Sequence, residues 1–289
     1  MFTGTGTALI TPFTEEGLID WDALAILVEE QGGVDFIVPC GTTGESATLS
    51  HDEHREVISF AVKQVAGRCR VIAGTGSNNT REALALTRHA AEVGADAALL
   101  ITPYYNRPTQ EGLFRHFAAL AESCGIDLVL YNVPSRTGVD LAAETVARLA
   151  ELPRVVAIKE ASGDVTRVSR IRELLSPGAS IEVLSGDDAL AVAAMALGAV
   201  GVVSVTANLV PELVQRMVGA MLAGDGGTAR ELHERIFPLS RVLFCSTNPI
   251  PVKAAMAERG WAKDVLRLPL VPLEPAARAA LRGVLERMS

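Results

Sequence analysis

The segment VVAIKEAS at residues 155–162 has the composition of a buried β-strand that carries a lysine near its exit. Val155, Ala157 and Lys159 fall on one face of a strand with period two, and the residues between them fall on the other. Lysine is almost never fully buried without a partner, so a lysine in this apolar run needs an explanation. Burial disfavours a charged ammonium, and the neutral amine can attack a carbonyl to form a Schiff base. The alternative is a lysine that extends its ammonium group into solvent at the end of the strand.

Seven similar runs lie before and after this segment, and helical stretches separate them, which is typical of parallel βα units. The eight predicted strands span residues 4–11, 35–40, 70–74, 97–102, 128–132, 155–160, 181–185 and 201–205. Eight such units over about 210 residues predict an α/β fold of the (β/α)8 TIM barrel type. An open doubly wound sheet is the alternative. It needs a G-x-G-x-x-G motif after an early strand, whereas the chain has only Gly74-Thr75-Gly76.

The predicted helices have recognisable starts and apolar faces. The first begins at Asp20, and the second begins with a capping box in which Ser50 and Glu53 are three positions apart. After the eighth strand, prolines and glycines divide the remaining chain into three or four helical pieces. We therefore expect a barrel domain over residues 1–225 and a C-terminal helical appendage, packed on the barrel, over residues 226–289.

Composition excludes several classes of function. The 289-residue chain is 49% hydrophobic and has a formal net charge of −8, which argues against a surface for nucleic acid or an anionic membrane. It has no apolar run of about 20 residues and no basic start, so we expect a cytoplasmic protein without a signal peptide. The four cysteines are scattered and form no C-x-x-C motif, so we expect neither a metal site nor a disulfide.

Polar motifs follow the predicted strands at the end where a barrel forms its active site. Each alone has a structural explanation, such as a turn that needs glycine. Together with the lysine they predict one site, composed of GTTGES at 41–46, TPYYN at 102–106, YNVP at 131–134, Lys159, and SGDD at 185–188.

Five stretches of this chain resemble the dihydrodipicolinate synthase family: GTTGES at 41–46, YNVPSRTG at 131–138, IKEASGD at 158–164, SGDD at 185–188 and NPIPVK at 248–253. That family belongs to the pyruvate-dependent class I aldolase superfamily, which also contains N-acetylneuraminate lyase. The similarity covers essentially the whole chain, with the motifs in the family's order and spacing.

The resemblance implies that Lys159 forms a Schiff base with pyruvate, and that the derived enamine adds to L-aspartate-4-semialdehyde in the diaminopimelate branch of lysine biosynthesis. It implies that Tyr131 donates and accepts protons, with Thr43 and Tyr105 as its relay, and that no metal or organic cofactor takes part. The chemistry agrees, because a phenol needs a hydrogen-bonded chain to exchange protons near neutral pH.

The resemblance also implies a set of substrate contacts. The arginine after YNVPS, Arg136, corresponds to the residue that holds the carboxylate of the semialdehyde, and a guanidinium binds a carboxylate with two parallel hydrogen bonds. Sialic-acid lyases usually lack this arginine and read GSTGE in place of GTTGE. The full implied set is Thr42, Thr43, Arg136, Gly186 and Val203.

A second cluster matches the cavity in which inhibited family members bind L-lysine. Its residues are Ser46, Ala47, His51, His54, Asn78, Glu82 and Tyr104. The histidines at i and i+3 can face one direction, but no third ligand makes a zinc site, and solvated histidines at a helix start are the plain alternative. In the family Tyr105 reaches the partner subunit's site, which implies a homo-oligomer, a dimer at minimum and a tetramer as the expected assembly.

Two other interpretations stay open at this point. One is another pyruvate-dependent aldolase on the same scaffold, such as a sugar-acid lyase, against which Arg136 and Thr42 argue. The other is a barrel that only binds a metabolite or partner, against which the complete set of Lys159, Tyr131 and Thr43 argues.

Overall fold

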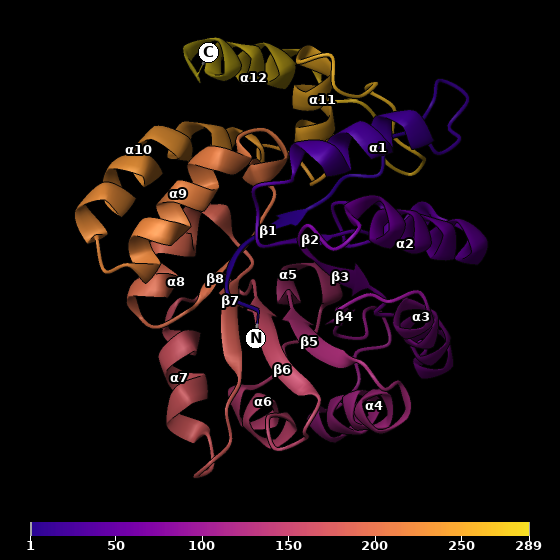
Figure 1. The fold of residues 1–289 in the computed structure, drawn as a ribbon, viewed down its shortest axis with the longest axis vertical. Helices are drawn as coiled ribbons and strands as arrows, with labels where there is room; N and C mark the ends of the chain where they lie inside the picture. Colours follow the sequence, from indigo (N-terminus) through magenta and orange to yellow (C-terminus); the bar gives the residue numbers. More distant parts are fainter. Residues whose placement is uncertain (1, 289) are drawn as a thin grey trace.

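Eight parallel strands close into a barrel in the computed structural model, which describes residues 2–288 (Figure 1). Each strand pairs with the next along the chain, and the last pairs with the first. The strands are β1 (Gly4–Ala8), β2 (Phe36–Val38), β3 (Arg70–Gly74), β4 (Ala97–Ile101), β5 (Asp127–Asn132), β6 (Val155–Glu160), β7 (Glu182–Ser185) and β8 (Gly201–Ser204). The predicted (β/α)8 barrel is confirmed, and the doubly wound sheet is excluded.

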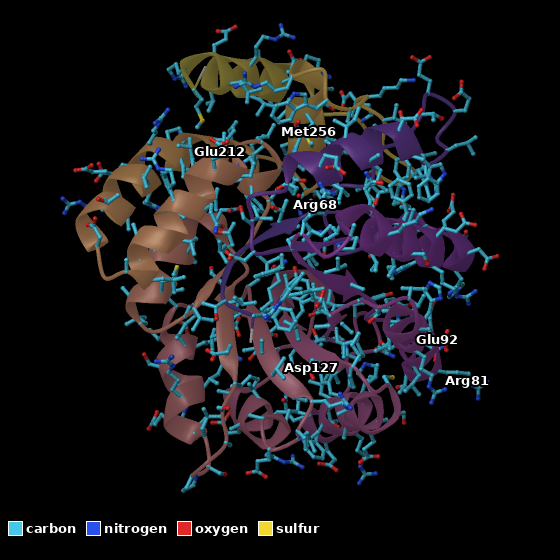
Figure 2. All side chains as sticks on the ribbon, in the orientation of Figure 1. Arg68, Arg81, Glu92, Asp127, Glu212 and Met256 are labelled. Carbon is cyan, nitrogen blue, oxygen red and sulfur yellow. The ribbon has the colours of Figure 1, made fainter. Side chains whose placement is uncertain are left out.

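Helices surround the barrel between the strands. Those of the βα units are α1 (Trp21–Glu30), α2 (His51–Val65), α3 (Thr80–Glu92), α4 (Gln110–Ser123), α5 (Pro134–Thr137), α6 (Ala143–Leu149), α7 (Thr166–Leu174), α8 (Ala191–Ala196) and α9 (Pro211–Leu222). Short 3-10 turns lie at Ser46–Thr48, Asp188–Leu190 and Thr206–Asn208. Figure 2 shows polar side chains such as Arg81 and Glu92 pointing outward from α3. Among the residues that the structure describes, no helix is both long and apolar enough to cross a membrane.

The helix starts are as predicted. Asp20 caps α1 by accepting a hydrogen bond from the Ala23 N–H at 3.0 Å. In α2 the Ser50 hydroxyl accepts from the Glu53 N–H, and the Glu53 carboxylate accepts from the Ser50 N–H. Both caps satisfy N–H groups that a helix leaves free at its first turn.

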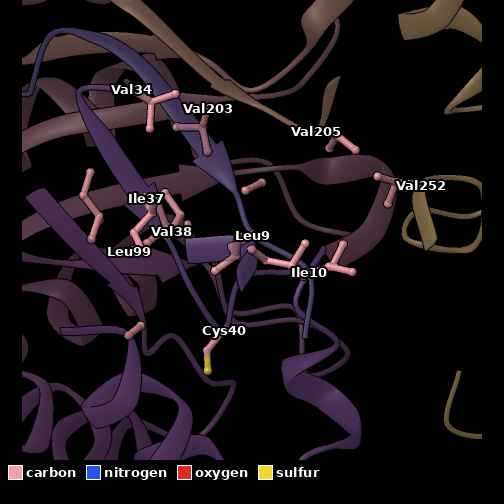
Figure 3. Close-up of a cluster of buried hydrophobic side chains, with 14 of the residues drawn as sticks. Leu9, Ile10, Val34, Ile37, Val38, Cys40, Leu99, Val203, Val205 and Val252 are labelled. Atoms are coloured by element: carbon pink, nitrogen blue, oxygen red, sulfur yellow. The ribbon is translucent and has the colours of Figure 1, made fainter. Parts of the chain in front are cut away.

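The first strand is shorter than predicted, because it ends at Ala8 rather than at Thr11. The backbone N–H of Ile10 donates to the Asn208 side chain at 3.3 Å instead of to a neighbouring strand. Leu9 and Ile10 remain fully buried, and Figure 3 shows them in one apolar cluster with Val252 of a C-terminal helix. The apolar run therefore predicts burial correctly and strand length incorrectly.

A register shift in β6 overturns one prediction about the lysine strand. Leu128 of β5 pairs with Val155, but the next residue pairs with Ala157, so one residue of β6 is skipped. This irregularity reverses the alternation. Val155 therefore packs in the same apolar cluster as Leu128 and Ile158, whereas Ala157 packs in the other cluster, which contains Tyr131. The expectation that Val155 shares a face with Lys159 is wrong.

The chain after α9 forms α10 (Gly226–Val242), α11 (Ile250–Glu258) and α12 (Pro275–Met288). Helix α10 packs on α9, and α12 packs on both α10 and α11. Figure 1 shows α11 and α12 at the same end of the molecule as α1. Met256 of α11 is fully buried and belongs to the same apolar cluster as the barrel residues, so these helices add to an existing core.

Candidate functional site

Lys159 and Tyr131 lie side by side inside the barrel. They are paired in register on β6 and β5, and the Lys159 Nζ is 4.4 Å from the centre of the Tyr131 ring. Only 6% of Lys159 is exposed. Gly186, just after β7, leaves room for the lysine, since a Cβ there would lie 3.1 Å from the Lys159 Cε and 2.6 Å from the Ala161 Cβ. The arrangement places an amine and a phenol next to each other, with both side chains largely buried.

The turn at 41–46 packs tightly against the adjoining strands. A Cβ on Gly44 would lie 3.1 Å from the Leu9 carbonyl oxygen, and the Gly44 carbonyl accepts a hydrogen bond from the Thr11 hydroxyl at 2.7 Å. Thr43 is buried, and its Oγ1 accepts a hydrogen bond from the Asn248 Nδ2 at 2.9 Å. The glycine thus permits the close backbone approach that buries Thr43.

Arg136 lies in the short helix α5 directly after β5. Its Nη2 donates a hydrogen bond to the main-chain carbonyl of Asn248 at 3.0 Å. Val203, the remaining predicted substrate contact, is buried on β8 in the same apolar cluster as Tyr131 (Figure 3). The structure therefore joins Arg136 and Thr43 through one residue, Asn248, that sequence reasoning did not single out.

A cavity of about 330 Å³ is lined by residues from both predicted sites, although its lining does not include Lys159, Thr43, Gly186 or Val203. From the predicted catalytic and substrate-binding set, its walls include Thr42, Tyr131 and Arg136. From the predicted lysine-binding set, they include Ser46, Ala47, His54, Glu82 and Tyr104. Within a single chain the two predicted sites thus border the same space.

The charged residues of the second set contact one another. The His51 Nε2 lies 3.0 Å from a Glu82 oxygen, and the other Glu82 oxygen accepts from the Ser77 hydroxyl at 2.5 Å. The His54 Nε2 lies 2.6 Å from the Gly74 carbonyl. A carbonyl only accepts, so this nitrogen carries the proton. Burial lowers the pKa of His54, which favours its neutral form. Of the two histidines, therefore, only His51 is a solvated helix-start residue.

Two neighbouring tyrosines have different surroundings. Tyr104 borders the cavity, whereas Tyr105 is 90% exposed and has a φ of +70°, a left-handed conformation that is unusual for a bulky residue. Asn106, the next residue, donates to the Asn78 carbonyl at 2.9 Å and so fixes the loop beside the second set. Within one chain Tyr105 does not join the buried group formed by Lys159 and Tyr131.

A buried ion pair behind the turn was not anticipated. The Lys253 Nζ donates to the Glu45 carboxylate and to the Val265 carbonyl, and both side chains of the pair are fully buried. Burial lowers the pKa of Lys253 to about 8, and the Glu45 charge opposes this shift. In NPIPVK the charged residue Lys253 follows an apolar run, whereas Glu45 in GTTGES has polar neighbours. The apolar run is the signal that could have found Lys253, but no local pattern says that it meets Glu45.

Among residues 2–288, no group of three or more histidine, cysteine, aspartate or glutamate side chains is placed to hold a metal ion. The side chains described above are an amine beside a phenol, with the phenol and a guanidinium on the wall of a partly open cavity. Such a set is suited to covalent capture of a carbonyl compound and to binding of a carboxylate.

Comparisons with known proteins agree with this chemistry. A family model described as the dihydrodipicolinate synthetase family matches residues 1–288. A 4-hydroxy-tetrahydrodipicolinate synthase from Methanothrix thermoacetophila is 55% identical over 291 residues, which cover 100% of this chain and 98% of that protein.

Solved structures give the same result. The chloride-inhibited dihydrodipicolinate synthase from Acinetobacter baumannii, complexed with pyruvate, superimposes with a TM-score of 0.96 at 47% identity and covers 100% of this chain and 99% of its own. DHDPS from Cyanidioschyzon merolae with lysine bound gives 0.95 at 41% identity, covering 99% and 98%. Because sequence, fold and family model agree over nearly the full length, the chain belongs to the dihydrodipicolinate synthetase family and is a lyase.

Proposed function

We propose that the chain condenses pyruvate with L-aspartate-4-semialdehyde, with pyruvate held as a Schiff base on Lys159. The product is 4-hydroxy-tetrahydrodipicolinate, in the diaminopimelate branch of lysine biosynthesis. The observation that carries the proposal is the buried Lys159 Nζ, 4.4 Å from the Tyr131 ring. The pyruvate complex of the Acinetobacter baumannii relative supports the choice of first substrate.

The proposed chemistry proceeds in four steps. The neutral Lys159 amine attacks C2 of pyruvate, and water leaves to give an imine. A methyl proton then leaves C3 to give an enamine. C3 attacks the aldehyde carbon of the second substrate, and the aldehyde oxygen takes up a proton. Finally, the substrate's own amino group attacks C2, which closes the ring and releases Lys159 as a free amine. The imine accepts the electron pair from C3, so no metal or organic cofactor is needed in this proposal.

Several of these steps move protons, and Tyr131 is the proposed group that moves them. Thr43 is the proposed neighbour in the relay, and its hydroxyl is held by Asn248. We propose that Tyr105 completes the relay in the site of a second copy. The 90% exposure of its ring and its left-handed backbone support this assignment, because a bulky aromatic in that state gains a buried environment at an interface.

The proposed assembly is therefore a homodimer at minimum, with a tetramer as the expected form.

Within each chain we propose residues 1–225 as the catalytic barrel and residues 226–289 as the packed appendage. Thr42, Gly186 and Val203 complete the proposed pyruvate site. Thr42 is included because it borders the same cavity as Tyr131. Gly186 is included because it leaves space beside Lys159.

An assay of purified protein with pyruvate and L-aspartate-4-semialdehyde tests the proposal, with N-acetylneuraminate as the alternative substrate. We expect turnover of the first pair only. Cleavage of N-acetylneuraminate would favour a sugar-acid lyase, against which the position of Arg136 at the cavity argues. A protein that turns over neither would be a barrel that only binds.

Arg136→Ala should lower kcat/KM for the semialdehyde at least about tenfold, because a lost hydrogen bond to a charged group costs roughly 1.5–3 kcal/mol. Imine formation with pyruvate, measured by borohydride trapping, should be largely unchanged. If Arg136→Ala weakened the reactions of pyruvate and of the semialdehyde equally, Arg136 would have only a structural role. In that role it would join α5 to the main-chain carbonyl of Asn248.

We propose that the second set of residues binds L-lysine as a feedback inhibitor. The lysine-bound structure of the Cyanidioschyzon merolae relative supports this. A free lysine has a carboxylate and two ammonium groups, so its site needs donors at one end and acceptors at the other. Tyr104 and Asn78 are the proposed donors, and Glu82 with the two imidazoles supplies acceptors. Because Tyr104 directly precedes Tyr105 in the chain, lysine binding that fixes the Tyr104 side chain should also shift Tyr105.

Glu82→Ala should weaken lysine inhibition roughly ten- to a hundredfold, since one charged hydrogen bond is lost. The uninhibited rate should change little. Titration of initial rates with lysine, and calorimetry on the same samples, measure both quantities. If millimolar lysine neither inhibits the wild-type protein nor produces binding heat, the proposed regulation is wrong.

A further inference from the structure

The segment NPIPVK at 248–253 is the one motif for which the proposed chemistry gives no task. Its first residue, Asn248, is only 6% exposed and borders the cavity together with Arg136 and Tyr131. The segment comes from the C-terminal part of the chain, so its presence beside the barrel opening is a product of tertiary packing. A buried amide at the wall of a substrate cavity is a candidate for direct contact with substrate.

The side-chain nitrogen and the main-chain carbonyl of Asn248 already have partners. The Nδ2 donates to the Thr43 hydroxyl oxygen at 2.9 Å, and the main-chain carbonyl accepts from the Arg136 Nη2 at 3.0 Å. Both partners belong to the proposed mechanism, Thr43 in the proton relay and Arg136 on the substrate carboxylate. Asn248 therefore lies between the place where protons move and the place where the second substrate is held.

The side-chain oxygen of Asn248, Oδ1, is buried and has no hydrogen-bond partner. A buried acceptor without a donor costs about 1–3 kcal/mol, and such groups in native proteins usually have a functional explanation. Pyruvate offers it no donor. The aldehyde substrate offers one, because it has an amino group on the carbon next to its carboxylate. If Arg136 holds that carboxylate, the amino group comes close to Asn248.

We propose, on the basis of the proposed function, that Asn248 is a further substrate-recognition residue whose free amide oxygen binds the amino group of the aldehyde substrate. The same side chain is a positioning residue for Thr43. Because Nδ2 donates to the Thr43 oxygen, the hydroxyl hydrogen of Thr43 stays free to donate to another acceptor.

A neutral amide also suits the last stage of the chemistry. The substrate amino group must be uncharged when it attacks C2 and closes the ring. A carboxylate at this position would stabilise the ammonium form, whereas an amide oxygen accepts an N–H bond without adding a negative charge. Asparagine thus orients the amine and leaves it able to lose its proton.

Two ligands that differ only in this amino group test the proposal. L-Homoserine and 4-hydroxybutyrate share the chain length, the carboxylate and a terminal hydroxyl group. Their dissociation constants for the pyruvate-saturated protein can be measured by NMR titration. We expect the wild-type protein to prefer L-homoserine, and Asn248→Leu to reduce that preference about tenfold, as loss of one hydrogen bond implies. An unchanged preference in Asn248→Leu would overturn the proposal.

Asn248→Asp separates the two roles. Aspartate keeps an acceptor oxygen, so the preference for L-homoserine should remain or increase. It has no donor for Thr43, so kcat should fall at least about tenfold. A kcat unchanged in Asn248→Asp would refute the positioning role. If Asn248→Leu fails to fold, Asn248→Ala takes its place in the binding test, and the same result is expected.

Asn79→Asp is the matched control. It makes the same chemical change at an exposed residue that caps α3, where aspartate caps equally well. We expect no change in either measurement.

Borohydride trapping of pyruvate by the wild-type protein distinguishes failure of the proposed function from failure of the Asn248 assignment. Without trapping, the proposed function itself is wrong. With trapping and turnover but no change of preference in the variants, only the assignment of Asn248 is wrong.

Discussion

Lys159→Arg should abolish reductive trapping of pyruvate and lower kcat by about 10³-fold or more, as expected for loss of a covalent nucleophile. A guanidinium stays protonated and cannot form the imine, although it keeps the positive charge and much of the length of lysine. The fold should persist, because the apolar neighbours on β6 stay in place. Borohydride with pyruvate, followed by peptide mass analysis, measures the adduct directly.

The chain has four lysines, so the site of labelling is easily assigned. Lys253 is the informative competitor, since it too is buried and burial lowers its pKa to about 8. Its Nζ is nevertheless occupied by Glu45 and by the Val265 carbonyl, which should keep it unreactive. Label on Lys253, or label that survives in Lys159→Arg, would refute the mechanism. Lys63→Arg on the exposed face of α2 should label as the wild-type protein does.

Lys253→Met should lower the free energy of unfolding by about 3–5 kcal/mol, because removing one partner leaves the other charge buried alone. Glu45 would keep only the Arg267 N–H at 3.2 Å as a donor. Glu45→Gln should cost a similar amount, since Lys253 would lose its counter-charge above the Phe13 ring at 3.9 Å. Urea denaturation at one fixed protein concentration measures this, because the proposed subunit association would make stability depend on concentration.

Lys263→Met is the matched control for this pair. Lys263 makes an exposed contact with Glu15 at 3.9 Å, so the same substitution should cost less than about 1 kcal/mol. The double variant Glu45→Gln, Lys253→Met should cost less than the sum of the single ones, since the two charges are removed together. A Lys253→Met protein as stable as the control would show that the pair contributes little.

The sequence predicts the features that depend on neighbours along the chain. All eight strands are predicted because apolar runs with β-branched residues alternate with segments that have the spacing of a helix. The capping box at Ser50 and Glu53 is predicted because its two hydrogen bonds join residues three positions apart. The end of β1 was misplaced because Ile10 is still buried although its N–H donates to a side chain and no longer to a strand. An apolar run predicts that its residues are buried, but it does not predict which hydrogen bonds their backbone groups form.

Contacts that join distant parts of the chain were beyond sequence reasoning. Asn248 and Thr43 are 205 positions apart, and Lys253 and Glu45 are 208 apart. The skipped residue in β6 likewise depends on how two strands adjust to each other, and no residue of VVAIKEAS marks it. The physical reason is the same in each case. These arrangements are set by packing among elements whose positions are fixed only after the barrel closes.

The two long-range contacts also bear on the timing of protein synthesis. A growing chain contains all eight strands once it reaches Ser204, but Asn248 and Lys253 belong to a stretch not yet made. At bacterial-like rates of about 5–20 residues per second, the rest takes on the order of ten seconds. During that interval Thr43 and Glu45 lack their partners. A chain whose translation stopped before Asn248 would therefore lack both contacts although it contained all eight strands, and under the proposed role of Asn248 its turnover should fall.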